Sequence, residues 1–326
     1  MSLSSLAAES QLSRLGLGAW AFGRTGWGVQ HDHDSRAAIL RALELGVNWI
    51  DTAAVYGDGH SEELIGRTLR ELSETERPLV FTKGGVRVDP SSGATFRDLR
   101  PASLREECEA SLRRLGLERV DLYQLHWPVD DPQVVEDAWE VMEQLRREGK
   151  VRWAGVSNFD VPMLERCAAN RPVEAAQAPL SLLSREAGAD LLPWAATHDV
   201  HTLVYSPLES GLLSGGFSPR RLLSLPEGDW RRQRTQFQRP RFDRALEFLE
   251  RLELIAARLG ASLAETAIAW TLTWPGVGGV IVGARSPEQA EGWIGASNLT
   301  LDDSVLDEIA AALLDTGAGG GPVQPR

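Results

Sequence analysis

The sequence predicts one α/β domain folded as a (β/α)8 barrel, or TIM barrel, with a long loop after its seventh strand. Three observations lead to this prediction. Eight short β-branched or apolar runs, each typical of a buried strand, are spread along the 326 residues. Segments with apolar residues three and four positions apart lie between them, as in amphipathic helices. Successive runs are about forty residues apart, which is typical of parallel strands joined by right-handed crossovers.

The predicted elements alternate in order along the chain. The eight runs interpreted as barrel strands are residues 15–20, 47–51, 79–83, 120–125, 152–157, 174–178, 202–206 and 279–283. The helical patterns between the earlier strands are residues 35–45, 61–72, 101–115, 132–148 and 161–169. Gly46, Gly116 and Gly149 each stand between a predicted helix and the next strand, where a left-handed cap is expected.

An open, doubly wound sheet is the competing architecture. Such a sheet usually carries the motif GxGxxG after its first strand, where the third glycine opens a helix. Here the chain reads GLGAWAFG from Gly16 to Gly23, and no helical pattern begins at the third glycine. We therefore favour the barrel.

The barrel domain is expected to cover residues 15–314, after an N-terminal extension of residues 1–14. Residues 315–326 are rich in glycine and have little side chain to bury, so they predict a flexible tail. Residues 218–244, in the long segment before the eighth strand, contain eight Arg and three acidic residues, a local net charge of +5. This stretch is either a solvated loop or a lid or binding loop at the catalytic face.

Composition excludes several classes of protein. Apolar residues make up 43% and charged residues 25%, which are ordinary values for a globular protein. The net charge of −12 argues against a general nucleic-acid binder or a binder of anionic membranes. Residues 266–284 carry no charge, but their glycines and Pro275 argue against a membrane-spanning helix.

Cysteine usage and the N-terminus indicate the compartment. The two cysteines, Cys108 and Cys167, form no disulfide framework and no CxxC motif. The N-terminus has neither the basic start nor the apolar core of a secretion signal, so we expect a cytoplasmic protein.

One cluster resembles a metal site. The run His31-Asp32-His33-Asp34 directly precedes a predicted helix and is better explained by helix capping, since no further ligand group is spaced to join it. We therefore predict no metal.

Titratable side chains gather where the predicted strands end, which is the catalytic face of a barrel. Asp51, Tyr56, Lys83 and His126 follow the second, third and fourth strands and form an acid–base set. A lysine ammonium beside a phenol favours the phenolate and so makes the phenol a better acid. Asp51 would hold the lysine in place, and His126 could orient a carbonyl oxygen.

These residues lie in motifs that resemble those of the aldo-keto reductase superfamily. The motifs are DTAxxYG from Asp51, TK at Lys83 and QLHW around His126, followed by GVSNF from Gly155 and YSPL from Tyr205. With LGLG from Leu15 and GARS from Gly283, the resemblance covers nearly the whole chain.

The resemblance implies a reductase that binds NADP(H) without a doubly wound domain and transfers hydride to an aldehyde or ketone. It makes Tyr56 the proton donor, Lys83 its activator, Asp51 the partner of the lysine and His126 the carbonyl-orienting residue. Ser157, Asn158 and Gln177 would hold the carboxamide, and Tyr205 would stack on the nicotinamide. The further cofactor contacts that the resemblance implies are Gly18, Trp20, Asp51, Ser206, Pro207, Leu208, Gly211, Leu213, Gly283, Arg285 and Gln289.

The phosphate site also has a physical argument. Ser286 and Pro287 are typical of an N-cap and first helical position, which leave free backbone N–H groups for a phosphate. Arg285 stands just before this turn and could meet a 2′-phosphate with its planar donors. Gln289 fits the family pattern, whereas Trp293 departs from it and either stacks on the adenine or packs in the core.

Two further sets of residues are assigned to the catalytic face. We interpret Trp20, Phe22, Trp27 and Trp127, together with Tyr56, as walls of an apolar substrate pocket. One or two of Arg220, Arg221, Arg231, Arg232 and Arg234 are expected to contact the cofactor pyrophosphate.

The expected function is NADPH-dependent reduction of small carbonyl compounds. The short tail suggests an open site with broad specificity. A sugar or polyol dehydrogenase running the same site in reverse is one alternative. A non-catalytic, cofactor-sensing subunit, as in the potassium-channel-associated branch of the superfamily, is another. No heptad repeat stands out, so the sequence assigns no oligomeric state.

Overall fold

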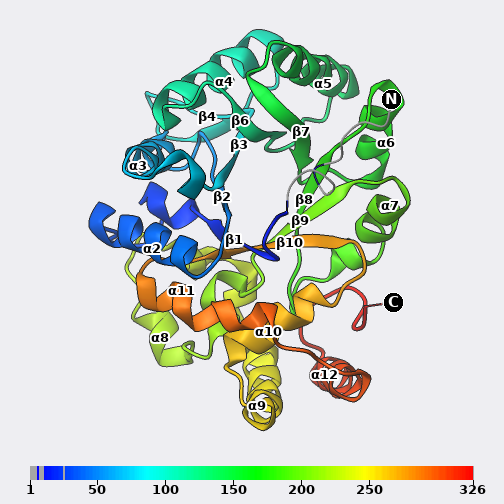
Figure 1. Cartoon of the computed structure of the whole chain (residues 1–326). Helices are drawn as coiled ribbons and strands as arrows, with labels where there is room; N and C mark the ends of the chain where they lie inside the picture. Colours follow the sequence, from blue (N-terminus) through cyan, green and yellow to red (C-terminus); the bar gives the residue numbers. More distant parts are fainter. Residues whose placement is uncertain (1–5, 7–10, 25, 326) are drawn as a thin grey trace.

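Eight parallel strands close into a barrel, and the helices surround it (Figure 1). The structure is a computed structural model that describes residues 6, 11–24 and 26–325. Around the barrel the strands follow the order β1-β10-β9-β8-β7-β6-β3-β2. They are β1 (Leu15–Gly18), β2 (Trp49–Asp51), β3 (Leu79–Gly84), β6 (Val120–Leu125), β7 (Val151–Ser157), β8 (Ala175–Pro179), β9 (His201–Tyr205) and β10 (Val277–Gly283). The predicted (β/α)8 barrel is confirmed.

Helices follow the strands and cover the barrel from outside. They are α2 (Asp32–Glu44), α3 (His60–Leu69), α4 (Pro101–Leu115), α5 (Pro132–Arg147), α6 (Val161–Asn170), α7 (Leu191–Thr197), α8 (Pro219–Leu223), α9 (Arg241–Leu259), α10 (Leu263–Leu272), α11 (Pro287–Ile294) and α12 (Asp303–Thr316). Gly46, Gly116 and Gly149 have φ values of 92°, 69° and 77°, so each adopts the left-handed conformation expected between helix and strand. No helix in the described part of the chain is both long and apolar enough to cross a membrane.

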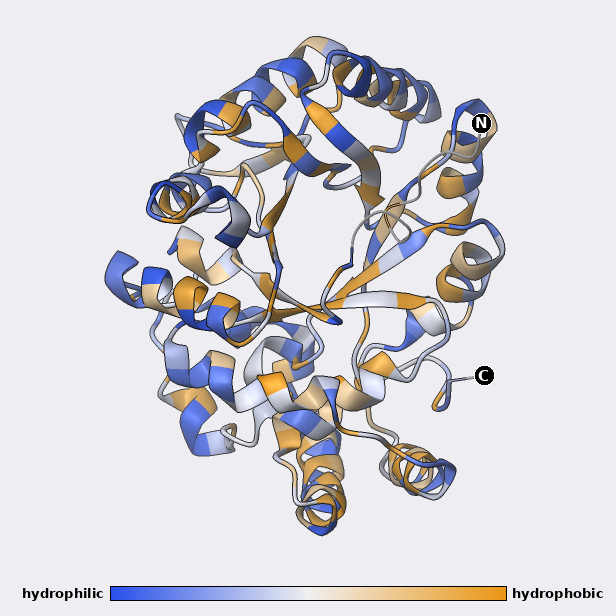
Figure 2. Ribbon diagram, viewed as in Figure 1, coloured by the Kyte–Doolittle hydropathy of each residue, from blue (hydrophilic) through white to orange (hydrophobic). Residues whose placement is uncertain are grey.

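Two apolar layers hold the barrel together. Helices such as α2, α3, α4, α5 and α6 turn their apolar side toward the outside of the strands (Figure 2). Inside the barrel a second cluster is built on Trp49, Phe81, Trp153 and Leu203, with Leu6 of the N-terminal extension packed against them. Residues 1–5 and 7–10 of the predicted extension lie outside the described residues. A Cβ on Gly16 would lie 2.3 Å from the Trp49 ring, so only glycine fits beside this indole.

Strand register brings the predicted site residues to one end of the barrel. Gly18 is paired with Asp51 on one side and with Gly283 on the other. Lys83 is paired with Gln124, and Ser157 with Gln177. Because parallel strands end on the same face, their polar termini converge there.

The segment after the seventh barrel strand, β9, is long, as predicted, but it is largely helical. It contains η4 (Glu209–Ser214), α8, η5 (Trp230–Gln233) and η6 (Thr235–Phe237) before α9 begins. Phe237 is buried and packs near Phe217 and Phe242, which anchors the segment to the domain.

The C-terminal segment, residues 317–325, differs from the flexible tail that its composition predicts. Arg185 is only 3% exposed and donates hydrogen bonds to the carbonyls of Ala318, Gly321 and Pro322, at 3.2, 3.4 and 3.0 Å. The backbone N–H of Arg185 also donates to Gly320 O at 3.0 Å. The segment needs no large side chains because its backbone carbonyls satisfy a buried guanidinium.

Candidate active site

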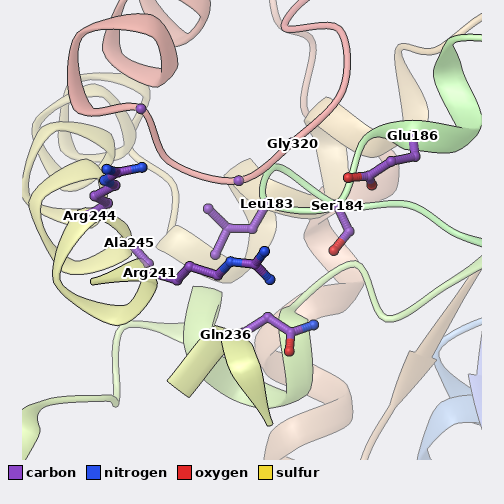
Figure 3. Close-up of a pocket in the computed structure, with 10 residues that line it drawn as sticks. Leu183, Ser184, Glu186, Gln236, Arg241, Arg244, Ala245 and Gly320 are labelled. Carbon is purple, nitrogen blue, oxygen red and sulfur yellow. The ribbon is translucent and has the colours of Figure 1, made fainter. Parts of the chain in front are cut away.

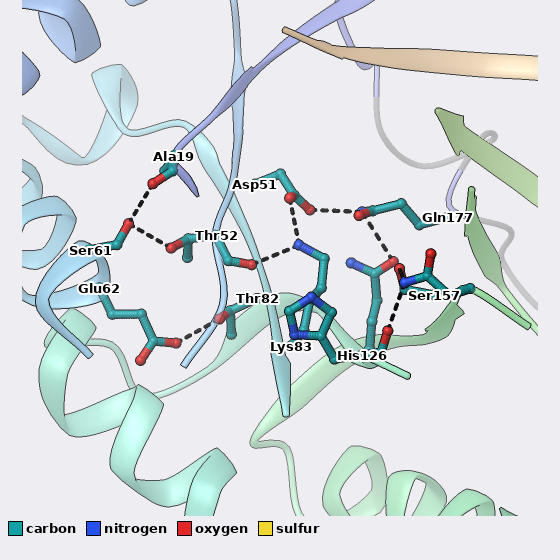
Figure 4. Close-up of polar contacts among 12 residues, drawn as sticks. Ala19, Asp51, Thr52, Ser61, Glu62, Thr82, Lys83, His126, Ser157 and Gln177 are labelled. Carbon is teal, nitrogen blue, oxygen red and sulfur yellow. Dashed lines mark hydrogen bonds and ion pairs between the residues drawn. The ribbon is translucent and has the colours of Figure 1, made fainter. Parts of the chain in front are cut away.

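Lys83 and Asp51 form an ion pair at the bottom of the site. Lys83 Nζ donates to Asp51 Oδ1 at 2.5 Å and to Thr52 O at 2.9 Å, and both side chains are almost fully buried (Figure 4). Burial lowers the pKa of Lys83, and Asp51 opposes this shift. The ammonium is thus held in a site with little water.

Two glutamines complete the polar floor. Gln177 Nε2 donates to the other carboxylate oxygen of Asp51 at 2.8 Å, and Gln124 Oε1 lies 3.4 Å from the same amide nitrogen (Figure 4). Gln177 is one of the predicted carboxamide ligands, and in the structure its amide N–H is bonded to Asp51.

A second group of buried polar side chains connects α3 to the strands that carry Asp51 and Lys83. Glu62 of α3 accepts a hydrogen bond from Thr82 Oγ1 at 2.6 Å and one from Arg114 Nε at 2.7 Å. Ser61 Oγ lies 2.9 Å from Thr52 Oγ1 and donates to Ala19 O at 3.1 Å (Figure 4). These bonds tie α3 to the ends of β1, β2 and β3. The sequence analysis did not identify Glu62, although it follows the Asp51–Gly57 motif by five residues.

Tyr56 lies above the ion pair. Lys83 Nζ is 5.3 Å from the centre of its ring. Burial and the charge of Asp51 raise the pKa of Tyr56 well above its usual value. This direction is opposite to the shift toward phenolate that the sequence suggested, because desolvation and Asp51 outweigh the lysine. Tyr56 is therefore a protonated phenol at neutral pH and can give a proton.

His126 faces the edge of Tyr56. The two ring centres are 5.8 Å apart and the rings are nearly perpendicular, at 77°. Burial and the nearby Lys83 charge lower the pKa of His126 well below its usual value, so its imidazole is neutral. His126 Nδ1 is buried, and no described residue forms a hydrogen bond with it. A neutral imidazole can donate one hydrogen bond to a carbonyl oxygen.

Asn158 joins three strand ends. Its Nδ2 donates to His126 O and to Ser157 Oγ, both at 3.0 Å, and its Oδ1 accepts from Tyr205 OH at 2.7 Å. Asn158 has a φ of 64°, a left-handed conformation that asparagine tolerates better than most residues. Ser157, Asn158 and Tyr205 are therefore brought together as predicted, beside His126.

The loop after β9 has an unusual backbone. Ser206, Glu209 and Ser210 have φ values of 58°, 44° and 59°, and Gly211 follows with 93°. Such a run of left-handed residues is strained and persists only where other contacts hold it. Arg231 Nη1 approaches Ser210 O at 3.4 Å.

The remaining residues predicted in this loop are placed as follows. Pro207 and Leu208 continue directly from β9, and Leu208 O accepts hydrogen bonds from the N–H groups of Gly211 and Leu213. The Leu213 side chain is fully buried in the core, so the structure gives it a packing role.

Arg285 and Gln289 lie at the start of α11, as predicted. Ser286 is the N-cap and Pro287 the first helical residue. Gln289 Oε1 accepts from the backbone N–H of Arg285 at 2.9 Å. The Arg285 guanidinium donates to Gln30 Oε1 at 2.7 Å and to Val29 O at 2.6 Å. Gln30, which the sequence analysis missed, thus orients Arg285.

Trp293 settles an alternative that the sequence left open. Its side chain is 2% exposed and belongs to the core, so it packs there.

The arginine-rich segment, residues 218–244, places the guanidinium groups of Arg231 and Arg234 on the same side of the barrel opening as Arg285. Arg231 is buried and pairs with Asp229 through bonds of 2.9 and 2.6 Å. Arg234 lies 4.8 Å from the ring centre of Trp230. The charge of Arg231 contributes, after burial, to a lowered pKa of Arg285. The Asp229 carboxylate offsets this repulsion, since it pairs with Arg231 and opposes the lowering of the pKa of Arg285.

An aromatic wall lies next to Tyr56. Trp20 lies 6.4 Å from Tyr56, 5.1 Å from Trp27 and 5.0 Å from Trp230 between ring centres. Trp230 comes from the arginine-rich segment, and no sequence pattern indicates its position. Trp127, 37% exposed, stands on the other side, directly after His126.

The prediction that Phe22 lines the pocket is wrong. Its side chain is fully buried in the core. The 3-10 turn η1 (Trp20–Gly23) rotates successive side chains by about a third of a turn, so Trp20 faces outward while Phe22 faces the core.

The predicted capping does not explain the cluster of residues 31–34, because the N-cap of α2 is His31, which makes no side-chain capping hydrogen bond within the described residues. Asp32 opens α2 and accepts hydrogen bonds from Arg24, His60 and Arg67 at 2.5, 2.8 and 2.8 Å. Within the described residues, no group of three or more His, Cys, Asp or Glu side chains is arranged to hold a metal ion.

A separate pocket of about 300 Å³ lies away from these residues. It is formed by the C-terminal segment, the start of α9 and residues 183–186, and none of Asp51, Tyr56, Lys83 and His126 lines it (Figure 3).

Comparison with known proteins places these features in a family. A family model for the aldo/keto reductase family matches residues 14–314. The aldo-keto reductase YhdN of Bacillus subtilis (strain 168) is 36% identical over 308 residues, covering 94% of this chain and 91% of that protein. The NADH-specific methylglyoxal reductase of Escherichia coli (strain K12) is 33% identical, covering 93% of this chain and 96% of that protein.

Solved structures give the same result. The glycerol dehydrogenase AKR11B4 from Gluconobacter oxydans superposes with a TM-score of 0.88 at 35% identity, covering 99% of this chain and 97% of that one. An aldo/keto reductase from Klebsiella pneumoniae in complex with NADP and acetate has a TM-score of 0.70 at 26% identity, covering 98% and 96%.

Proposed function

The chain belongs to the aldo/keto reductase family, and from this premise we propose that it reduces small aldehydes or ketones to alcohols with NADPH. The observation that carries the proposal is the buried Lys83–Asp51 pair beneath Tyr56, with the neutral His126 at the edge of the phenol ring. Tyr56 supplies a proton donor, Lys83 a cation and His126 a hydrogen-bond donor around the proposed position of the carbonyl oxygen.

The residues on the β9 and β10 side fit a dinucleotide. Arg285 stands just before α11, and the charge of Arg234 acts on Tyr205 at the end of β9. A bound diphosphate or 2′-phosphate would accept charge-assisted hydrogen bonds from these guanidinium groups. The free N–H groups at the start of α11 add donors to the same region.

When bound, the reduced nicotinamide supplies the hydride that the carbonyl carbon receives. Tyr56 gives its phenolic proton to the carbonyl oxygen. The Lys83 ammonium then stabilises the phenolate, and Asp51 keeps the lysine charged and fixed. His126 donates a hydrogen bond to the carbonyl oxygen and so orients it beside Tyr56.

The strand ends beyond His126 would position the cofactor ring. Ser157 and Gln177 offer oxygens to a carboxamide, and Asn158 holds Tyr205 at 2.7 Å so that its ring can stack. Gly18 at the end of β1 keeps the strand close to Ile281, since a Cβ there would lie 2.8 Å from that side chain.

Arg285 favours NADPH over NADH in this proposal, because only NADP carries a 2′-phosphate. The relatives differ in this respect: the Klebsiella structure contains NADP, and the Escherichia coli enzyme is named NADH-specific. Titration of the wild-type protein and Arg285→Ala with NADPH and NADH tests the assignment. Arg285→Ala should weaken NADPH binding at least about tenfold and NADH binding little.

A polyol dehydrogenase is a second candidate, supported by the resemblance to the glycerol dehydrogenase. The same residues would then act in reverse, with Tyr56 accepting the proton. Initial rates with a panel of aldehydes, ketones and polyols, in both directions, separate the two functions. A protein that binds cofactor tightly but turns over none of these compounds would instead be a cofactor-sensing subunit.

A further inference from the structure

A β-hairpin absent from the sequence prediction stands at the mouth of the barrel. β4 (Val86–Val88) and β5 (Thr95–Arg97) pair antiparallel, with Val86 opposite Arg97. The hairpin begins immediately after β3, the strand that carries Lys83. Gly85, with a φ of 89°, turns the chain, and the N–H of Asp98 returns to Gly85 O at 3.1 Å.

Arg97 at the end of this hairpin is fixed beside the site. Its guanidinium carbon lies 5.0 Å from the centre of the Trp127 ring, and its Nη1 donates to Pro128 O at 2.8 Å. Trp127 directly follows His126 at the end of β6 and is partly exposed. The indole and the backbone carbonyl therefore hold the cation next to the residue that orients the carbonyl.

Arg97 lacks the carboxylate partner that its neighbours have. Arg87 on the same hairpin pairs with Glu106 at 2.9 Å, and Arg100 pairs with Asp98 at 2.7 Å. In the described part of the chain, no carboxylate forms an ion pair with Arg97. A guanidinium has five N–H donors, and the bond to Pro128 uses one of them, so donors remain for a ligand.

The position of Arg97 separates it from the proposed cofactor contacts. In the order around the barrel, β3 lies opposite β9 and β6 lies opposite β10. Arg97 and Trp127 follow β3 and β6, whereas Arg234 and Arg285 follow β9 and β10. Arg97 therefore stands across the mouth from the arginines that would hold the dinucleotide, on the side left to the substrate.

We propose that Arg97 is a specificity-determining residue that binds an anionic group, a carboxylate or a phosphate, at the far end of the carbonyl substrate. This inference rests on the proposed function. The flat face of Trp127 supports the carbon chain between the carbonyl and the anion. The net charge of −12 repels an anionic substrate at long range, and a local cation offsets this repulsion.

The test uses two matched pairs of aldehydes. Succinic semialdehyde and butanal differ by a carboxylate, and glyceraldehyde 3-phosphate and glyceraldehyde differ by a phosphate. We expect wild type to show a kcat/KM about tenfold higher for at least one anionic member than for its neutral partner, the size expected from one charge-assisted hydrogen bond. The pair that shows the preference identifies the anion.

Single substitutions show which side chain causes the preference for the anionic aldehyde. Arg97→Gln should remove this preference by raising the KM for the anionic aldehydes, with little change for the neutral aldehydes. Arg97→Lys should keep part of the preference. Arg87→Gln is the control on the same hairpin and should keep the preference. The preference should also decrease with ionic strength.

Two results would overturn the inference while leaving the proposed function intact: a wild type that reduces neutral and anionic aldehydes equally well, or an Arg97→Gln variant that loses both activities alike. If wild type binds NADPH but reduces none of the four compounds, both the inference and the proposed function fail.

Discussion

Lys83 Nζ and Asp51 Oδ1 lie 2.5 Å apart, and neither side chain is more than 4% exposed. Breaking such a buried pair leaves an uncompensated charge, which costs about 3–5 kcal/mol. Either Asp51→Asn or Lys83→Met should therefore lower the free energy of unfolding by about 3 kcal/mol and abolish turnover. The double variant should regain much of the stability but none of the activity, as measured by urea denaturation and steady-state rates. Additive losses in the double variant would contradict the pairing.

The C-terminal segment provides a second test. Deleting residues 317–326 removes the carbonyl oxygens that Arg185 binds and leaves a buried guanidinium without those acceptors. We expect the free energy of unfolding to fall by about 2–3 kcal/mol. Combining the deletion with Arg185→Leu should recover part of this loss. A deletion that leaves the denaturation midpoint unchanged would show that the segment is not held as described.

Glu107 of α4 should make the free energy of unfolding depend on pH. It is 7% exposed and accepts a hydrogen bond from Gly85 N, yet burial raises its pKa to about 7. A carboxyl whose pKa is higher in the folded than in the unfolded state costs stability as it ionises. Its contribution to the free energy of unfolding should therefore fall by about 3 kcal/mol between pH 4.5 and pH 7.

Glu107→Gln removes this titration. The difference in unfolding free energy between wild type and the variant should shift by about 2–3 kcal/mol between pH 5 and pH 7.5, in favour of the variant at high pH. Arg87 and Asp98 face Glu107 and remain in both proteins, so they cancel. A difference that does not change with pH would refute the expectation.

Arg234 remains the candidate of the five arginines for the cofactor pyrophosphate. Its charge acts on Tyr205 at the end of β9, whereas Arg231 is paired with Asp229 and Arg232 donates to Leu225 O at 3.1 Å. Arg220 and Arg221 lie exposed on α8. Arg234→Ala should raise the Kd for NADPH about tenfold and weaken its dependence on salt. Arg220→Ala, on the exposed helix α8, is the matched control, and tryptophan fluorescence follows binding. Equal affinities in the two variants would exclude the contact.

The sequence predicted the parts of the site that lie within single strand ends. Asp51, Lys83, His126 and Ser157 lie within one residue of the end of a strand, and Gln177 lies two residues before the end of β8. These strands could be recognised from their sequence pattern, and barrel closure brings the five residues together. Glycine caps such as Gly116 were also predictable, because their conformation depends on local sequence.

Contacts between residues far apart in the sequence could not be predicted in this way. Trp230 reaches Trp20 from more than two hundred positions away, and Gln30 reaches Arg285 from a similar separation. The order of residues 317–325 depends on Arg185, whose partners are backbone carbonyls that carry no sequence signal. The pKa direction of Tyr56 likewise depends on burial, which local motifs do not reveal.

The role of Tyr56 as proton donor is the centre of this account, and Tyr56→Phe tests it most directly. The phenol is protonated at neutral pH, so the rate of carbonyl reduction should stay high there and fall only at alkaline pH. The control is Tyr123→Phe. The buried hydroxyl of Tyr123 has no hydrogen-bond partner among the residues that the structure describes, so its removal should leave activity intact.

The deciding measurement is single-turnover oxidation of bound NADPH by an aldehyde that wild type reduces. In Tyr56→Phe the rate should fall about 10²–10⁴-fold, the usual contribution of a general acid, with the Kd for NADPH within about twofold of wild type. A Tyr56→Phe enzyme that reduces the aldehyde at the wild-type rate would contradict the account.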